Sequence, residues 1–198
     1  VRLRDHVRRL VAAPRLPLDA DARAAIGTLA DSLQARRPSI GERVAAGKAL
    51  RERVPRSAHA TYDKAADRPD PVDILERQNV DRVQKLVPVR YARMLVSPFA
   101  FLRGSAAVMA SDLSRTPVTG MAVGACGDMH VSNFGVYASA ERNLVFAIND
   151  FDEVHPGPWE WDLKRLAASA AVAARFMGAN RVQAEEAAQA VVRSYRKR

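Results

Sequence analysis

Two polar segments on either side of a hairpin-length stretch constrain the fold of this chain more than any other feature. Residues 127–135 read Gly-Asp-Met-His-Val-Ser-Asn-Phe-Gly, so that Asp128 and Asn133, five positions apart, share one tight loop. Two short apolar runs around a polar turn follow, and an acidic cluster comes next. We therefore predict that residues 121–162 form a strand, a loop, a β-hairpin and an acidic turn that leads to a helix.

The composition is that of a globular domain with a positive charge. The chain has 198 residues, of which 48% are hydrophobic and 27% are charged, and this suits one domain with a core of its own. The formal net charge of +9 attracts anions in general. The positive residues are mostly arginines spread over the expected helices, without the interleaved aromatics of a strand-binding surface. We therefore expect a solvated basic face rather than a nucleic-acid groove.

Cysteine usage and hydropathy bear on the compartment. Cys126 is the only cysteine, so that no internal disulfide and no Cys-cluster metal site can form, and the cytoplasm is the simplest location. No apolar run approaches the ~20 residues that a membrane span requires. Residues 1–6 lack the apolar core of a signal peptide. We expect no membrane association, and the sequence carries no signal for an oligomeric state.

Helical periodicity and breakers divide the chain into two regions. We expect residues 1–69 to form a helical N-terminal region with a linker. We expect residues 70–198 to form a core that is truncated at its C-terminus, because the chain begins with Val and finishes inside a helical pattern. In the first region, residues 19–35 and 40–54 are predicted to be an antiparallel helix pair, and residues 55–70 the linker.

The second region is expected to be of the α+β class. Asp70 and Pro71 begin a helix that Pro88 ends, and Gly157 with Pro158 breaks the chain before the last two helices. The other expected elements are a short strand at 99–104, a helix capped by Ser105 that runs to Leu113, a buried strand at 121–125, strands at 136–138 and 144–148, a helix capped by Asp162 with Leu163, Leu166, Ala170, Ala173 and Met177 inside, and a final helix from Ala184 to Arg198.

The polar residues between positions 127 and 152 suit phosphoryl transfer from a nucleotide. This chemistry needs a carboxylate that orients and deprotonates an acceptor hydroxyl, and a divalent metal that neutralises phosphate charge. Magnesium prefers hard oxygen ligands, often one or two carboxylates with waters and phosphates. We assign Asp128 as the candidate base, Asn133 as a neutral oxygen ligand of the metal, and Asp150 as its carboxylate ligand.

The same segment resembles known phosphotransferases. Residues 127–133 resemble the G-D-x-H-x-x-N loop of aminoglycoside and choline phosphotransferases, which have a protein-kinase-like fold. Residues 149–152 resemble their metal-binding I-D-[FW]-[DE] element, and residues 161–163 resemble their Y-D-L-A element, in which the Asp supports the catalytic loop. The resemblance implies a partial kinase-like catalytic core that uses ATP and Mg²⁺. This core would phosphorylate a hydroxyl group, which we expect to belong to a small molecule.

A second similarity covers about residues 70 to 178. There the chain is similar to a bacterial family known as domain of unknown function 2252, for which no reaction is established. The matching stretches are residues 86–91, 97–104, 126–130, 149–153 and 157–166. Members of that family are longer, which agrees with a truncated core. We therefore expect the 198 residues alone to lack part of a nucleotide site and to be inactive by themselves.

Three further residues receive candidate roles. We expect His130 to belong to the catalytic loop and to fix it by hydrogen bonds, with a metal or substrate contact as the alternative. Asp152 is a candidate second metal ligand, and a solvated turn is the alternative for it. We place Arg103 at the end of a strand before a helix start, where it would meet nucleotide phosphate or form an internal ion pair.

The chain departs from the phosphotransferase pattern in two places. Cys126 stands where those enzymes have His, and neither a glycine-rich phosphate loop nor a strand-borne Lys is recognisable before Asp128. A non-catalytic, kinase-like nucleotide-binding protein is therefore the alternative function. A metal-dependent phosphoesterase is a weaker alternative, because only His130 and His155 lie near the acidic residues in the sequence.

Overall fold

The structure is a computed structural model that describes residues 36–197. The chain divides into two compact units, residues 1–48 and 49–198, and each is described by itself. The helix expected at residues 19–35 lies outside the described residues, and so does its pairing with the next helix. The expected boundary between residues 69 and 70 stays a prediction.

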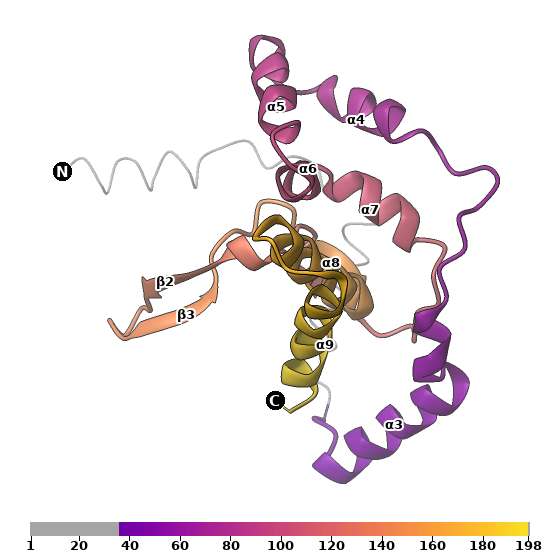
Figure 1. Cartoon of the computed structure of the whole chain (residues 1–198). Coiled ribbons are helices and arrows are strands. Elements are labelled where there is room, and N and C mark those ends of the chain that lie inside the picture. Colours follow the sequence, from indigo (N-terminus) through magenta and orange to yellow (C-terminus); the bar gives the residue numbers. More distant parts are fainter. Residues whose placement is uncertain (1–35, 198) are drawn as a thin grey trace, which may run out of the picture. The chain divides into compact units, whose positions relative to one another are not determined.

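The described chain mixes helices with short strands (Figure 1), as expected for the α+β class. In chain order, the elements are α3 (Ile40–Arg53), a 3-10 turn (Arg56–Ala60), α4 (Pro71–Asn79), a 3-10 turn (Gln84–Leu86), α5 (Val87–Met94), α6 (Pro98–Gly104), α7 (Ala106–Leu113), β1 (Ala122–Ala125), a 3-10 turn (Val131–Asn133), β2 (Phe134–Ala138), β3 (Leu144–Ile148), β4 (His155–Pro158), α8 (Trp159–Phe176) and α9 (Arg181–Lys197). No helix among the described residues is long and apolar enough to cross a membrane.

The strands form two antiparallel pairs. β2 and β3 make the expected hairpin, in which Phe134 faces Ile148, and Figure 1 shows this hairpin extending away from the helices. β1 pairs with β4, and Ala125 faces His155 at the end of that ladder. Two expectations are wrong here. β1 is not a buried strand, since only Ala125 of its four residues is buried, and Gly157 with Pro158 continues the chain in β4 rather than breaking it.

Proline positions explain two differences among the first helices. Asp70 caps α4 as expected, and its carboxylate accepts a hydrogen bond of 2.7 Å from the Val72 backbone N–H. Pro88, however, lies in the first turn of α5 instead of ending α4, because a proline there sacrifices no intrahelical hydrogen bond. The segment expected as a strand at 99–104 is helix α6, since the Ser97 hydroxyl accepts from the Ala100 N–H and Pro98 follows the cap.

A small apolar cluster joins α4, α5 and α7. Leu75, Met94 and Val108 are buried together, and Ile74 and Tyr91 pack against them. The polypeptide before α4 is tied to α7 by ion pairs, since Arg68 binds both carboxylate oxygens of Asp112 at 2.6 and 2.8 Å and Arg115 pairs with Asp67. The expected linker thus belongs to the second unit, and its last residues are held against α7 and the turn that follows it.

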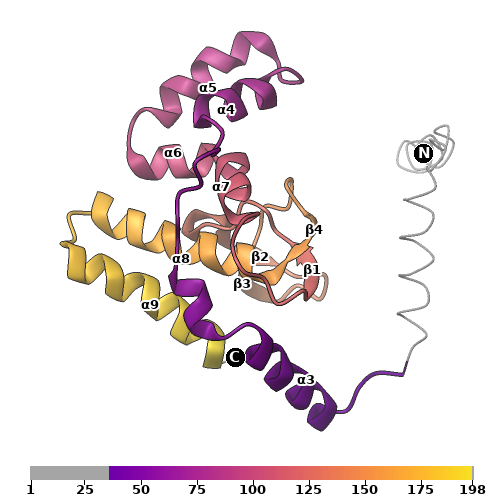
Figure 2. The ribbon, with the colours of Figure 1, turned by 90° about the vertical axis from the view of Figure 1, so that its right-hand side faces the viewer.

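α8 and α9 pack side by side, with α8 against the strands of β1 and β4 (Figure 2). Two expectations about these helices are wrong. α8 begins at Trp159, so that Asp162 lies inside it and does not cap it, and its buried residues are the polar Glu160, Arg165 and Ser169. α9 begins earlier than expected, because Asn180 and Gln183 exchange side-chain to backbone hydrogen bonds of 2.9 and 3.0 Å as a capping box. Met177, expected inside, is 84% exposed.

Candidate catalytic loop and acidic turn

Asp162 of α8 holds the start of the Asp128 loop. Its two carboxylate oxygens accept hydrogen bonds from the backbone N–H groups of Cys126, at 2.7 Å, and Gly127, at 3.1 Å. A carboxylate with two backbone donors is a strong, charge-assisted anchor, so the loop is fixed to a helix at its first residues.

Ser169 of α8 anchors the loop further along. Its hydroxyl, which is fully buried, accepts a hydrogen bond of 3.1 Å from the Val131 N–H and donates one of 2.7 Å to the Leu166 carbonyl. The Asn133 N–H donates to the His130 carbonyl at 2.9 Å and closes the 3-10 turn. Because α8 provides an acceptor at each end of residues 126–131, the loop has one defined path over this helix.

Three contacts bring the acidic turn against this loop. The Cys126 thiol lies 3.5 Å from the Asp150 carbonyl oxygen, and the Asn149 N–H donates to the Asn133 carbonyl at 3.1 Å. Burial, followed by the charge of Asp162, raises the pKa of the Cys126 thiol, so the thiol stays a donor. The third contact is between Gly127 and Glu153. Residues 126–133 and 149–153 are therefore neighbours, as the hairpin register requires.

Gly127 allows this close approach. Its φ of +79° is left-handed, a conformation that glycine adopts without strain. A Cβ added at this position would lie 2.5 Å from the Glu153 carbonyl oxygen and 3.0 Å from the Glu153 Cβ. The loop and the acidic turn can therefore touch only if position 127 has no side chain.

We expect the Gly127→Ala substitution to push the acidic turn away from the loop. The left-handed backbone alone costs an alanine about 1–2 kcal/mol, and the contact with the Glu153 backbone adds to this cost. Urea unfolding of the full-length protein measures it as a lower midpoint with an unchanged slope. Gly178→Ala, between α8 and α9, is the matched control, since Gly178 has a φ of +93° but open space around it. An equal loss in both variants would contradict the close approach.

Asp128 is bound from two sides. Arg165 of α8 donates to Asp128 Oδ1 through Nε at 3.0 Å and through Nη2, while His130 Nε2 lies 3.5 Å from Oδ2. Burial raises the pKa of Asp128, but the nearby His130 imidazole, the hydrogen bonds from Arg165 and the Arg165 charge outweigh burial and hold the pKa below its usual value. Asp128 is therefore ionised at neutral pH, as a proton acceptor must be.

His130 is almost completely buried within the loop, with 3% of its surface exposed. Its ring meets Phe99 of α6 edge to face at a centroid distance of 6.5 Å. Its Nδ1 is buried and has no hydrogen-bond partner in the described part of the chain. The imidazole thus lies beside Asp128 by one nitrogen and packs against Phe99 of α6 by its ring.

The three candidate metal ligands differ in their surroundings. Asn133 is buried, and its side-chain N–H donates to the Asp128 carbonyl at 2.8 Å, which orients the amide and leaves its oxygen as the free ligand atom. Asp150 and Asp152 are exposed on the turn, where Asp150 Oδ1 accepts from the Asp152 N–H at 3.2 Å. Among residues 36–197, no three His, Cys, Asp or Glu side chains form a metal-binding group.

Arg103 occupies a different position from the expected one. It lies in the last turn of α6, at the helix C-terminus rather than at the end of a strand, and its side chain is exposed. It makes no hydrogen bond or ion pair with any residue that the structure describes. The neighbouring Leu102 carbonyl, by contrast, accepts a hydrogen bond of 2.7 Å from Arg165. Leu102 is thus linked to the loop through Arg165, whereas Arg103 is not.

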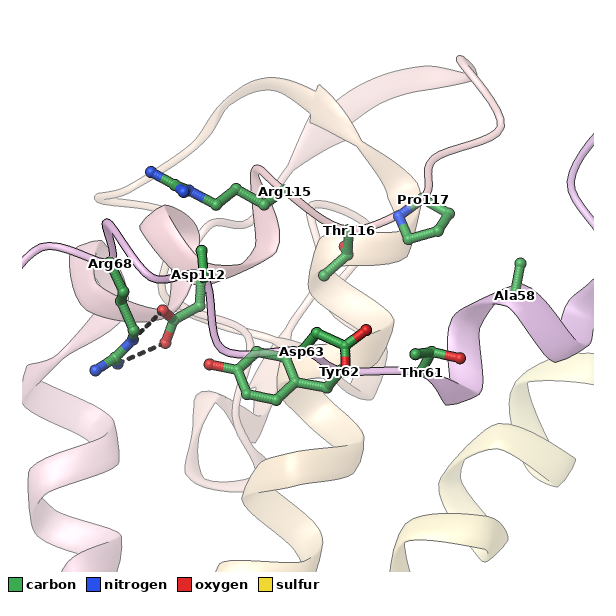
Figure 3. A pocket seen from close by; sticks show the side chains of 10 residues that line it. Ala58, Thr61, Tyr62, Asp63, Arg68, Asp112, Arg115, Thr116 and Pro117 are labelled. Atoms are coloured by element: carbon green, nitrogen blue, oxygen red, sulfur yellow. Dashed lines mark hydrogen bonds and ion pairs between the residues drawn. The ribbon is translucent and has the colours of Figure 1, made fainter.

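A pocket of about 220 Å³ lies elsewhere in the second unit, between the residues that precede α4 and the end of α7 (Figure 3). Its wall includes Tyr62, Asp63 and Thr116, and the Arg68–Asp112 ion pair closes one side. None of the site residues expected from the sequence lines this pocket. Two of its charged residues, Arg68 and Asp112, pair with each other, and Arg115 pairs with Asp67 outside the lining, so the pocket's charges do not select a ligand class.

Arg165 and Ser169 belong to this cluster but were not predicted from the sequence. Together with Asp162, they occur at positions i, i+3 and i+7 of one helix, which is the spacing of residues that share a face. A polar stripe at this spacing, directly after the Trp-Asp-Leu element, was the available signal. It was overlooked because the neighbouring Leu and Ala residues suggested an apolar inner face.

Comparisons with known proteins support a family relationship and nothing finer. The sequence model of a family described as "Uncharacterized protein conserved in bacteria (DUF2252)" matches residues 82–198, which is more than half of the chain. The matched range includes the Asp128 loop, the hairpin, the acidic turn and both final helices. No curated protein and no solved structure matches the chain.

Proposed function

We propose that this chain, which belongs to the DUF2252 family, carries the catalytic segment of an ATP- and magnesium-dependent phosphotransferase with a protein-kinase-like core. The acceptor in this proposal is the hydroxyl group of a small molecule. The supporting observation is the contact between the two polar segments: the loop with Asp128 and Asn133 lies directly against the turn with Asp150. A base and two oxygen ligands in neighbouring segments suit phosphoryl transfer.

Asp128 is the base in this proposal. Its carboxylate accepts the proton of the acceptor hydroxyl, and the acceptor oxygen forms a bond to the γ-phosphorus of ATP. The bond between that phosphorus and the oxygen bridging to the β-phosphate breaks, and its electron pair leaves with ADP. The lowered pKa of Asp128 keeps its carboxylate ionised and therefore able to accept a proton, and the anchors from Asp162 and Ser169 keep the loop in place.

Asn133 and Asp150 are the residues that would hold magnesium, with Asp152 as a further carboxylate. All their available ligand atoms are hard oxygens, which suit Mg²⁺ and not a thiophilic metal. Magnesium commonly takes only one or two protein carboxylates, so a group of three acidic or His ligands is not required. When bound, the ion would neutralise charge on the phosphates of the donor.

A non-catalytic nucleotide-binding protein is the second candidate function. The observation that favours it is the bond from Arg165 to Asp128 Oδ1, because a carboxylate oxygen that is held by a guanidinium is a weaker proton acceptor. This reading keeps the roles of Asn133 and Asp150 and removes that of Asp128. Nucleotide binding tests both candidates together, and turnover separates them.

We expect Asp150→Asn to weaken magnesium-dependent ATP binding by the full-length protein. The substitution removes the charge of the proposed carboxylate ligand and keeps its size, so the loss arises from the metal site and not from packing. Isothermal calorimetry with ATP, with and without magnesium, measures the affinity. Glu141→Gln on the turn of the neighbouring β2–β3 hairpin is the matched control, since Glu141 is exposed and, among the described residues, its carboxylate accepts a hydrogen bond only from Ser139. Unchanged magnesium-dependent affinity in Asp150→Asn would reject the metal assignment.

A further inference from the structure

We propose that Arg165 is a positioning residue that holds Asp128 by Oδ1 and thereby makes Oδ2 the oxygen that takes the proton from the acceptor. The inference rests on the proposed function for its chemical meaning. Its structural part, the fixed orientation of the Asp128 carboxylate, stands on the contacts of Arg165 alone.

The guanidinium of Arg165 donates hydrogen bonds to only one oxygen of the Asp128 carboxylate. Nε lies 3.0 Å from Asp128 Oδ1, and Nη2 donates to the same oxygen. A bidentate pair with one nitrogen on each oxygen would engage both oxygens equally. Here the two donors converge on Oδ1 instead, and Arg165 makes no hydrogen bond to Oδ2.

Two further contacts fix the guanidinium itself. Nη2 also donates to the Leu102 carbonyl of α6 at 2.7 Å, and Nη1 lies 3.5 Å from the Met109 sulfur of α7. The side chain starts on α8, so α6, α7 and α8 together determine the orientation of its planar guanidinium group. Lysine cannot reproduce this geometry, because its ammonium is a point charge on a flexible stem.

Oδ2 is the carboxylate oxygen that Arg165 does not bind. Its neighbour is His130 Nε2 at 3.5 Å, which is longer than an ordinary hydrogen bond. The side chains of Arg165 and His130 are each 3% exposed, whereas that of Asp128 is 21% exposed. Asp128 is therefore the most accessible side chain of this cluster, and Arg165 already occupies one of its two oxygens.

A purely structural ion pair would predict a different behaviour. In that case Arg165 only compensates the buried charge of Asp128, and its loss lowers stability without a specific loss of rate. Positioning predicts a lower kcat, because a displaced catalytic group can cost about 10²-fold in rate. The two readings thus differ in kinetics and in the effect of a lysine at position 165.

The test compares Arg165→Met, Arg165→Lys and Arg68→Met in the full-length protein with ATP, magnesium and a panel of hydroxyl compounds. Arg68→Met is the matched control, since it removes an arginine that binds Asp112 through two nitrogens far along the chain from the loop. We expect Arg165→Met to lower kcat by about 10²-fold with a nearly unchanged KM for ATP. Arg165→Lys should recover only part of kcat, and Arg68→Met should lose stability but keep kcat.

Three outcomes would overturn the proposal. The first is an unchanged kcat in Arg165→Met. The second is a loss of kcat in Arg68→Met that is as large as the loss in Arg165→Met. The third is a wild-type kcat in Arg165→Lys, which would mean that a positive charge alone suffices. If the wild-type protein has no turnover, the proposed function fails. A double-mutant cycle of unfolding midpoints for Arg165→Met and Asp128→Asn then tests whether Arg165 holds the Asp128 carboxylate. Additive shifts would show that Arg165 does not hold Asp128.

Discussion

The Asp128→Asn variant of the full-length protein is expected to bind ATP with magnesium as the wild type does and to turn it over about 10²–10⁴-fold more slowly. Asparagine keeps the shape of the side chain, but its amide cannot accept the proton of the acceptor hydroxyl. The proposed metal ligands, Asn133 and Asp150, remain in place. The loss should therefore appear in kcat and not in nucleotide affinity, and calorimetry with steady-state kinetics measures both.

Folding has to be compared in the same experiment, because the substitution also leaves the Arg165 guanidinium without its charged partner. An uncompensated buried charge destabilises a protein, so the variant is assayed well below its unfolding temperature. Asp112→Asn is a control, since it removes the charged partner of Arg68 on α7, outside the loop. A kcat that is equal in Asp128→Asn and wild type would remove Asp128 from the mechanism.

Asp162→Ala is expected to cost the largest amount of stability among the substitutions discussed. Each buried donor that loses its partner costs about 1–3 kcal/mol, so the loss of both the Cys126 and the Gly127 bonds should cost about 2–6 kcal/mol. The free energy of unfolding in urea measures this cost. Because these two residues begin the loop, magnesium-dependent ATP binding should fall in parallel.

Asp73→Ala is the matched control for Asp162→Ala. Asp73 also lies in the first turn of a helix, α4, but it is exposed and its carboxylate makes no hydrogen bond with another described residue. A surface substitution of this kind usually changes stability by less than about 0.5 kcal/mol. If Asp162→Ala were as mild as Asp73→Ala, the anchoring of the loop by α8 would be disproved.

The hairpin and the loop could be predicted because their signals are local. Alternating apolar residues around a polar turn determine β2 and β3 within fifteen positions or so of sequence, and the Asp128 loop lies directly before them. The supporting role of Asp162 came from the resemblance. Local propensity alone favoured a helix cap at this position, and this was wrong because the carboxylate binds loop backbone instead of its own helix.

The parts that the sequence did not predict depend on contacts between distant residues. Arg165 and Asp128 are 37 positions apart, and only the packing of α8 against the loop brings them together. α6 is a local failure of a different kind: the aromatic residues of 99–104 favoured a strand, but Ser97 and Pro98 start a helix just before them. Arg103 was misplaced as a consequence, because its expected position depended on that strand.

The central claim is tested most directly by the thermal unfolding of the full-length protein with ATP, in the presence and absence of magnesium. If the loop and the acidic turn form a magnesium-dependent nucleotide site, ATP at a hundredfold excess over its dissociation constant should stabilise the protein by about 2.7 kcal/mol. The stabilisation should require magnesium and should be lost in Asp150→Asn. An unfolding temperature that ATP and magnesium leave unchanged, at any concentration of ATP up to the millimolar range, would contradict the account.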